Sequence, residues 1–211
     1  MKKSFEQWLW EDLEHDFGIQ RVSKFPALAN WLNTSVDLEE NLIQQLEALH
    51  KTLILHFMDW NEDELKMQFI APLLFLVNFN DSDFYQPFSQ RQLKATINEI
   101  ELVGIVDWLL ASGKQIPRAP FFFIHEYKKE KGTSNDPLGQ LLSTMLAANE
   151  LNDTSKIIYG TYIIGKDWYF VTLKDKTYSV SLPFSTTDFN NLKKVFTFLR
   201  QVKKLIQSSN S

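Results

Sequence analysis

Carboxylates stand inside two apolar runs of the chain, in places where buried strands seldom carry charge. Asp107 lies within the run Glu101–Ala111, and Glu126 lies within Phe121–Lys128, two positions before the lysine. A buried carboxylate without a partner is costly in free energy, so both acids need one. Carboxylate oxygens suit the hard cations Mg2+ and Mn2+. The two runs therefore indicate a metal site shared by Asp107 and Glu126.

The alternation of side chains along a strand orders the groups around this site. The residues expected on one side are Ile124, Glu126 and Lys128, and those expected on the other are Phe121, Phe123, His125 and Tyr127. If the two runs pair through residues 112–120, Asp107 and Glu126 meet at one end of a sheet. Lys128 could then orient or deprotonate a water, or stabilise negative charge on a phosphate. His125 is expected to have a structural role.

The set Asp107, Glu126 and Lys128 resembles the motif of the PD-(D/E)XK nuclease superfamily, in which an acid on one strand precedes (Asp/Glu)-x-Lys on the next. Val106 stands where the proline that names the motif would be. The resemblance covers about residues 61–164. It implies a nuclease that uses Mg2+ or Mn2+, with Asp107, Glu126 and the backbone carbonyl of Tyr127 as metal ligands. Lys128 is then expected beside the attacking water or the phosphate.

A further acid upstream extends the resemblance. The segment Asn61–Leu74 is similar to the first core helix of the nuclease domains in type I restriction enzymes, whose early glutamate points at the metal. Alignment on residues 70–74 places Glu62 at that position. Asn61 and Glu64 have the spacing of a capping box, so they are expected to start the helix. Pro72 should kink or interrupt it.

A glutamine downstream is the last candidate for the site. Asp136 and Pro137 suit the N-cap and first position of a helix, and Gln140 follows in its first turns. Some branches of the superfamily carry a glutamine near the metal on this helix, which makes Gln140 the matching residue. A solvated helix glutamine is the equally open alternative.

The order of elements predicts an α/β fold with a restriction-endonuclease-like αβββαβ core and a mixed sheet. After the helix from Asn61 comes a hairpin turned at residues 98–99, then the strand that ends at Lys128, a helix, and a strand at Lys156–Ile164 parallel to the previous one. Two antiparallel strands and an amphipathic helix follow. They span Trp168–Lys174, Thr177–Leu182 and about Thr187–Gln207.

Residues 1–60 are expected to form a helical cover on a nuclease-like domain of residues 61–211, without folding independently. Helices are predicted at Ser4–Phe17, at Ala27–Leu32 and at Leu38–Met58, the last opened by a capping box at Asp37. Uncharacterised bacterial proteins have a similar layout, with a helical N-terminus, a Glu-x-Lys strand, an Asp-Pro helix and a hairpin carrying tryptophan.

Composition limits the other classes of function. The chain has 211 residues, 44% of them hydrophobic, which is enough for one substantial core. It has no cysteine, so disulfides and thiolate metal ligands are excluded. We find no signal peptide, no apolar run of about 18 residues that could span a membrane, no glycine-rich phosphate loop and no zinc-like histidine spacing. A cytoplasmic protein that does not enter a membrane is expected.

Charge argues both for and against nucleic acid as the partner. The net charge of −4 is unusual for a free-standing nucleic-acid binder. Two local sets of cations could nevertheless meet phosphates: Lys114, Arg118, Lys128, Lys129 and Lys131, expected near the site, and Lys193, Lys194, Arg200, Lys203 and Lys204 on the last helix, where an ordinary solvated face is the main alternative. DNA is expected rather than RNA. A protein partner or a homodimer stays open.

Two other readings of the acidic residues belong to different classes. In one, the chain has a nuclease fold but no catalysis, and binds nucleic acid or a partner protein. In the other, Glu126 forms a buried ion pair with Lys128 or another cation. The ion pair leaves Asp107 without a partner, which makes it the weaker alternative.

Overall fold

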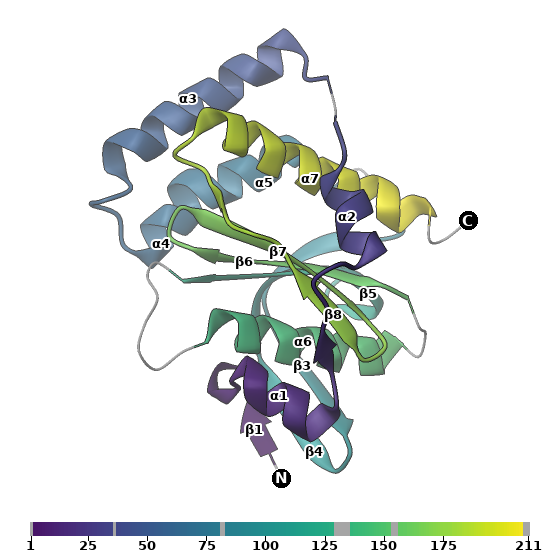
Figure 1. The fold of residues 1–211 in the computed structure, drawn as a ribbon. Helices are drawn as coiled ribbons and strands as arrows, with labels where there is room; N and C mark the ends of the chain where they lie inside the picture. Colours follow the sequence, from purple (N-terminus) through teal and green to yellow (C-terminus); the bar gives the residue numbers. More distant parts are fainter. Residues whose placement is uncertain (1, 36, 81–82, 129–135, 153–155, 209–211) are drawn as a thin grey trace.

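One mixed sheet forms the centre of the protein, with helices packed on both of its faces (Figure 1). The computed structural model describes residues 2–35, 37–80, 83–128, 136–152 and 156–208. The strand order is β1-β4-β5-β6-β7-β8-β2, with β3 paired to β4 and β9 paired to β7. The expected α/β class with a mixed sheet is confirmed. The strands are β1 (Lys2–Ser4), β2 (Gln20–Arg21), β3 (Gln86–Ile97), β4 (Ile100–Ser112), β5 (Arg118–Lys128), β6 (Ile158–Ile164), β7 (Asp167–Lys174), β8 (Thr177–Val180) and β9 (Phe184–Ser185).

The helices divide the interior into two hydrophobic cores. On one face lie α2 (Pro26–Leu32), α3 (Glu40–His56), α4 (Glu62–Leu65), α5 (Ala71–Val77) and α7 (Phe189–Ser208); their apolar residues and the sheet form what we call the α7 core. On the other face lie a 3-10 turn at Phe5–Gln7, α1 (Trp10–Phe17) and α6 (Pro137–Asn152), which form the α6 core.

The helix that begins at Glu62 continues through a π-helical turn at Lys66–Ile70 into α5. Pro72 has no N–H to donate to the carbonyl four residues earlier. The widened turn accommodates this loss, because the N–H of Ala71 donates to the carbonyl of Lys66, five residues back. The predicted interruption at Pro72 is thus confirmed as a π turn.

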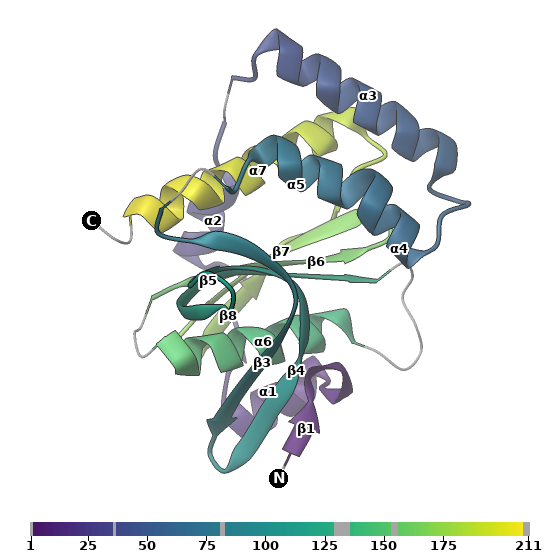
Figure 2. The ribbon, with the colours of Figure 1, turned by 180° about the vertical axis from the view of Figure 1, so that it is seen from behind.

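The hairpin of β3 and β4 is long and strongly curved, as Figure 2 shows. Ile97 pairs with Ile100 across a two-residue turn in which Asn98 and Glu99 have φ values of 49° and 64°. Two positive φ values are typical of the type I′ turn that suits tight hairpins. The predicted turn is confirmed, and the curvature brings the middle of β4 against the end of β5.

The second half of the chain follows the predicted order. β6 runs parallel to β5 after α6, and β7 and β8 extend the sheet in antiparallel pairing. The predicted last helix is α7. None of the described helices is both long and apolar enough to cross a membrane.

The N-terminal region differs from the prediction in two places. Ser4–Phe17 is not one helix: β1 pairs in parallel with β4, and a 3-10 turn precedes α1. The ring of Phe5 packs directly on Gly104, where a Cβ would lie 2.5 Å from that ring. This close contact holds the N-terminal segment against the sheet. The capping box at Asp37 is also wrong, since α3 begins at Glu40 without a side-chain cap. The short helix at Pro26–Leu32 is confirmed.

Candidate functional site

Asp107 lies where β4 separates from β5. Trp108 pairs with His125, and the pairing of the two strands goes no further toward the N-terminus of β4. The backbone N–H of Tyr127 reaches across this opening and donates to Oδ2 of Asp107 at 3.2 Å. The carboxylate of Asp107 is therefore fixed at the end of the β4–β5 ladder, level with Glu126.

The strand β4 is irregular at Asp107. Side chains two positions apart normally share a face, yet Val106 lies in the α6 core and Trp108 in the α7 core. On β3, Gln90 adopts a positive φ of 51°, which is uncommon for a residue other than glycine. Its Nε2 donates to Oδ1 of Asp107 at 2.8 Å. At this level, therefore, the alternation of side chains between the two cores is shifted by one residue in both strands. Gln90 binds the second carboxylate oxygen of Asp107.

Glu126 is the most deeply buried acid of the site, with 1% of its surface exposed. Oε2 accepts a hydrogen bond of 2.9 Å from Nε2 of Gln140, and Oε1 has no hydrogen-bond partner within the described part of the chain. Burial, followed by the negative charge of Asp107, holds the pKa of Glu126 well above its usual range. Because no donor among the described residues reaches Oε1, a cation could bind this buried oxygen.

The helix α6 carries Gln140 to this carboxyl. Oδ1 of Asp136 accepts from the N–H of Leu138 at 3.1 Å, and its Oδ2 accepts from the N–H of Trp10 at 2.8 Å. Gly139 lies against the backbone of Trp8, where a Cβ would come within 2.2 Å of the carbonyl oxygen. The start of the helix is therefore held in place. Gln140 is 3% exposed, so the alternative of a solvated glutamine is wrong.

Lys66 is a member of the site that the sequence reading missed. Its Nζ lies 2.7 Å from Oε1 of Glu62, 3.4 Å from Oδ1 of Asp107 and 4.6 Å from the ring centroid of Tyr127. Burial lowers the pKa of Lys66, but the hydrogen bond to Glu62 and the charges of Asp107 and Glu62 outweigh it and raise the pKa overall. The spacing of Glu62 and Lys66, four residues apart on a helix, was the available signal.

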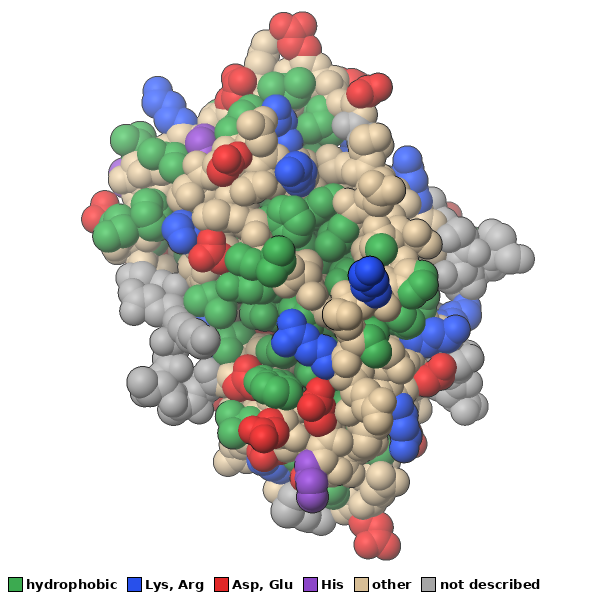
Figure 3. Space-filling view, in the orientation of Figure 1, with side chains coloured by type: hydrophobic (Ala, Val, Ile, Leu, Met, Phe, Trp, Pro, Cys, Tyr) green, Lys and Arg blue, Asp and Glu red, His purple; other side chains and the backbone are tan. Residues whose placement is uncertain are grey.

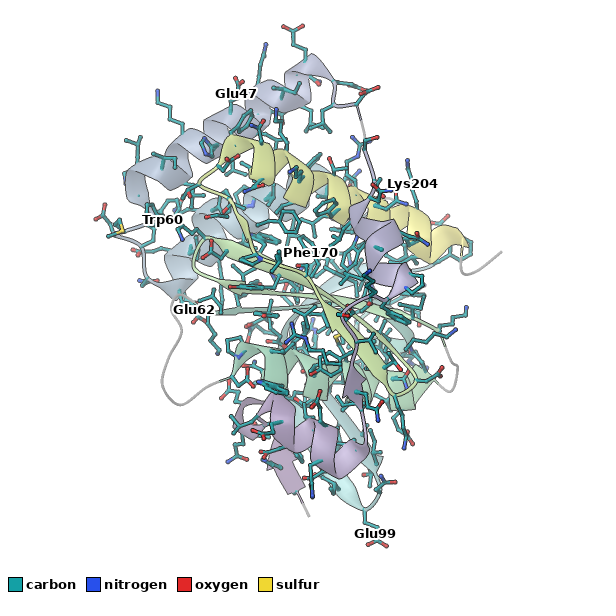
Figure 4. The ribbon with its side chains drawn as sticks, in the orientation of Figure 1. Glu47, Trp60, Glu62, Glu99, Phe170 and Lys204 are labelled. Atoms are coloured by element: carbon teal, nitrogen blue, oxygen red, sulfur yellow. The ribbon has the colours of Figure 1, made fainter. Side chains whose placement is uncertain are left out.

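Glu62 starts α4 beside the strand ends of the sheet (Figure 4). The predicted capping box is confirmed: the N–H of Glu64 donates to Oδ1 of Asn61 at 2.9 Å, and the N–H of Asn61 donates to Oε2 of Glu64 at 2.7 Å. Glu62 is left to bind Lys66. The structure therefore links Glu62 to Asp107 through a lysine rather than directly.

Lys128 ends β5 two residues after Glu126 and is half-buried. Its charge lowers the pKa of Glu126 and so partly offsets the effect of burial. Tyr127, between the two, contacts Asp107 through its N–H. The role of the Tyr127 carbonyl as a ligand stays a prediction.

The side chains of β5 project to the predicted sides of the sheet from Phe123 to Lys128, but not at the start of the strand. Leu110 pairs with Phe123 and Ala111 with Phe121, which leaves Phe122 as the extra residue of a bulge. Phe121 consequently lies in the α6 core with Ile124, not with Phe123.

His125 points away from Glu126, as predicted. It is fully buried in the α7 core, with its ring centroid 5.2 Å from that of Trp168. Burial lowers the pKa of His125 to about 3. The ring is therefore neutral at physiological pH, which agrees with a structural role.

Several of the cations expected near the site lie elsewhere. Arg118 precedes Glu126 by eight positions on β5, or roughly 25 Å along the strand, and Lys114 lies in the connection beyond it. Lys129 and Lys131 fall outside the described residues.

On α7, Lys203 is not simply solvated: its Nζ donates to the carbonyl of Asn78 at 2.8 Å. Lys193 and Lys194 line a hollow of about 890 Å³.

The donor atoms of the site fit a hard divalent cation. Within the described residues, no group of three or more His, Cys, Asp or Glu side chains is placed to hold a metal. Mg2+, however, is commonly bound by one or two carboxylates, with waters and substrate phosphates as the other ligands. The unpartnered Oε1 of Glu126 beside Asp107 meets that requirement.

Comparison with known proteins adds no constraint on function. No protein-family model matches the chain, and no curated protein sequence matches it. Function must therefore be inferred from the geometry of the site.

Proposed function

We propose that this chain is a metal-dependent phosphodiesterase of the PD-(D/E)XK type that cleaves nucleic acid. The observation that carries the proposal is the buried carboxyl of Glu126, whose neighbour is Asp107 and whose Oε1 has no donor among the residues that the structure describes. A helix, three strands, a helix and a parallel strand surround the site in the order typical of that superfamily. DNA as substrate, a cytoplasmic setting and a protein partner or homodimer belong to the same proposal.

Three groups of the chain would hold Mg2+ or Mn2+: the carboxylates of Asp107 and Glu126 and the carbonyl of Tyr127. When bound, the metal supplies charge neutralisation on the phosphate and a more acidic water. Gln140 donates to Oε2 of Glu126 and so would leave Oε1 for the cation. Gln90 orients Asp107 in the same way.

The two lysines would act on the substrate. Lys128 orients the attacking water or, in its neutral form, takes the proton of that water; the water oxygen bonds to phosphorus, the ester bond to the leaving sugar oxygen breaks, and that oxygen takes a proton from a solvent water. Lys66 partly offsets the negative charges of Glu62 and Asp107. Beside these two carboxylates, the ammonium group of Lys66 would also be within reach of a phosphate oxygen of the substrate. Glu62 then keeps Lys66 within reach of the site.

The test is cleavage of supercoiled plasmid and of labelled single strands in Mg2+ or Mn2+. Asp107→Asn and Glu126→Gln should lose cleavage, because each removes a negative ligand without changing shape. Asp63→Asn is the matched control, since Asp63 is an exposed acid on α4. Cleavage that survives Glu126→Gln contradicts the proposal.

A second candidate function is a nuclease fold without catalysis that binds nucleic acid or a protein. Lys66 already supplies Asp107 with a cation, which favours this alternative. Figure 3 also shows acidic and basic side chains intermingled on the face it draws, without a continuous basic surface among the described residues. Titration calorimetry with Mn2+ separates the two functions, because only the nuclease needs a metal at Glu126.

A further inference from the structure

A hollow of about 270 Å³ adjoins the candidate site on the side of the α7 core. Lys66 and Tyr127 line the hollow and also belong to the candidate site, so a ligand in the hollow would lie beside Asp107. Its lining also includes the aromatic residues Phe75, Phe79 and Trp108. The hollow is therefore an aromatic extension of a charged site.

The aromatic residues of the hollow differ in their burial. Phe79 and Trp108 are buried and lie with ring centroids 5.2 Å apart, so they form a rigid floor. Phe75, on the rim, is 77% exposed and leaves its ring in water. Asn80 and Ser89 are exposed polar residues of the same lining. The hollow thus combines ring faces for stacking with groups that can form hydrogen bonds.

A second hollow, of about 540 Å³, continues from the other side of Phe75. Arg200 and Lys203 belong to its lining. A chain passing over Phe75 would therefore have cations on both sides, Lys66 on one and Arg200 on the other. This spacing of charge around an exposed ring suits a strand in which phosphates alternate with bases.

We infer that the 270 Å³ hollow binds one unstacked nucleobase of a single-stranded nucleic acid, with the base against Phe75 and the adjoining phosphate at Lys66. This inference rests on the proposed nuclease function and names its substrate class. A base inside a duplex is stacked on both faces and cannot offer its ring to a pocket, so a duplex would have to expel a base before it could bind there. Single strands should accordingly bind better than duplexes of the same length.

The experiment measures binding without cleavage. Fluorescence anisotropy of a labelled oligothymidylate of about 12 nucleotides is recorded in EDTA, with the same sequence in a duplex as comparison. Wild type should prefer the single strand, and Phe75→Ala should weaken its binding about tenfold, since stacking on an exposed ring contributes on that order. Phe75→Trp should restore binding. Leu182→Ala, at an apolar residue 83% exposed, is the matched control and should bind as wild type does.

The outcomes separate this inference from the nuclease proposal. Loss of binding in Phe75→Ala supports the pocket even if Mn2+ never produces cleavage, in which case only the catalytic proposal fails. Equal binding by Phe75→Ala and Leu182→Ala overturns the pocket, even if cleavage depends on Asp107. A change from dimer to monomer in Phe75→Ala, with oligonucleotide binding intact, would assign the hollow to a second copy of the chain and also overturn it.

Discussion

Nε2 of Gln140 on α6 donates to Oε2 of Glu126 on β5, fourteen residues earlier, at 2.9 Å. The bond joins a helix of one layer to a carboxyl inside the sheet, and both side chains are almost fully buried. Because the amide satisfies only one carboxyl oxygen, it fixes the orientation of Glu126 and leaves Oε1 available. The pair is thus a structural contact that, in the proposed metal site, would also orient a ligand.

Replacing Gln140 by alanine should destabilise the protein by about 1–3 kcal/mol, the usual cost of leaving a buried polar group without its hydrogen bond. Urea unfolding monitored by circular dichroism measures this change. Gln92→Ala, at an exposed position on β3, should change stability by less than about 0.5 kcal/mol. Equal effects of the two substitutions would show that the bond to Glu126 contributes nothing.

The acidity of Glu126 should appear in the pH dependence of stability. Its pKa is raised in the folded state, so folding favours the protonated form. The stabilising contribution is complete below the unfolded pKa of about 4.5 and is lost as the pH rises toward the folded pKa. In EDTA, wild type should therefore lose stability relative to Glu126→Gln as the pH rises above about 4.5, by at most about 1.4 kcal/mol per pH unit. If the free energy of unfolding, measured with urea, changed with pH by the same amount in both proteins, the raised pKa of Glu126 would be excluded.

Divalent metal should stabilise the folded protein. A ligand that binds only the native state adds about 2.7 kcal/mol at a hundredfold excess over its Kd, and for a chain of this length each kcal/mol raises Tm by about 2–4 °C. Millimolar Mn2+ should therefore raise Tm by several degrees, and Asp107→Asn should abolish the rise. Asp63→Asn should keep it. A rise that survives in both Asp107→Asn and Glu126→Gln would place the ion elsewhere.

Lys66→Met should have opposite effects on stability and on metal affinity. Loss of the ammonium leaves Glu62 and Asp107 without their shared cation, so the metal-free protein should be less stable by about 1–3 kcal/mol. The same loss removes the competitor for Asp107, so Mn2+ should bind more tightly by calorimetry. Lys94→Met, which breaks an exposed pair with Glu101, should change neither quantity appreciably. Unchanged Mn2+ affinity in Lys66→Met would show that the lysine does not compete with the metal.

The parts of the site that the sequence predicted are those with local signals. The alternation of side chains along a strand predicted that Glu126 and His125 project to opposite sides of the sheet. The helix start at Asp136 and Pro137 predicted that Gln140 lies in the first turns of α6. Asp107 was found because a carboxylate interrupts an apolar run. In each case a short stretch of chain carries enough information, since strand period and helix caps depend on near neighbours.

The parts that were missed depend on contacts between distant segments. Lys66 reaches Asp107 across 41 residues; its spacing from Glu62 indicates an ion pair along the helix but not the contact with Asp107. The bulge at Phe122 moves Phe121 to the other core, although all three phenylalanines fit a regular strand equally well. Phe5 and Trp8 have the spacing of residues on one face of a helix, but Phe5 instead packs on Gly104 against the sheet.

Lys128 should be needed for cleavage and dispensable for metal binding, because an ammonium group is not a metal ligand. Lys128→Ala should remove most nicking of supercoiled plasmid while leaving Mn2+ affinity close to that of wild type, whereas Glu126→Ala should remove both. Lys128→Arg should restore little, since the guanidinium is broader and keeps its proton. Lys174→Ala, at the end of β7, is the matched control for loss of one positive charge. If Lys128→Ala cleaves as fast as this control, Lys128 neither orients the water nor takes its proton, and the proposed role of the Glu-x-Lys motif is wrong.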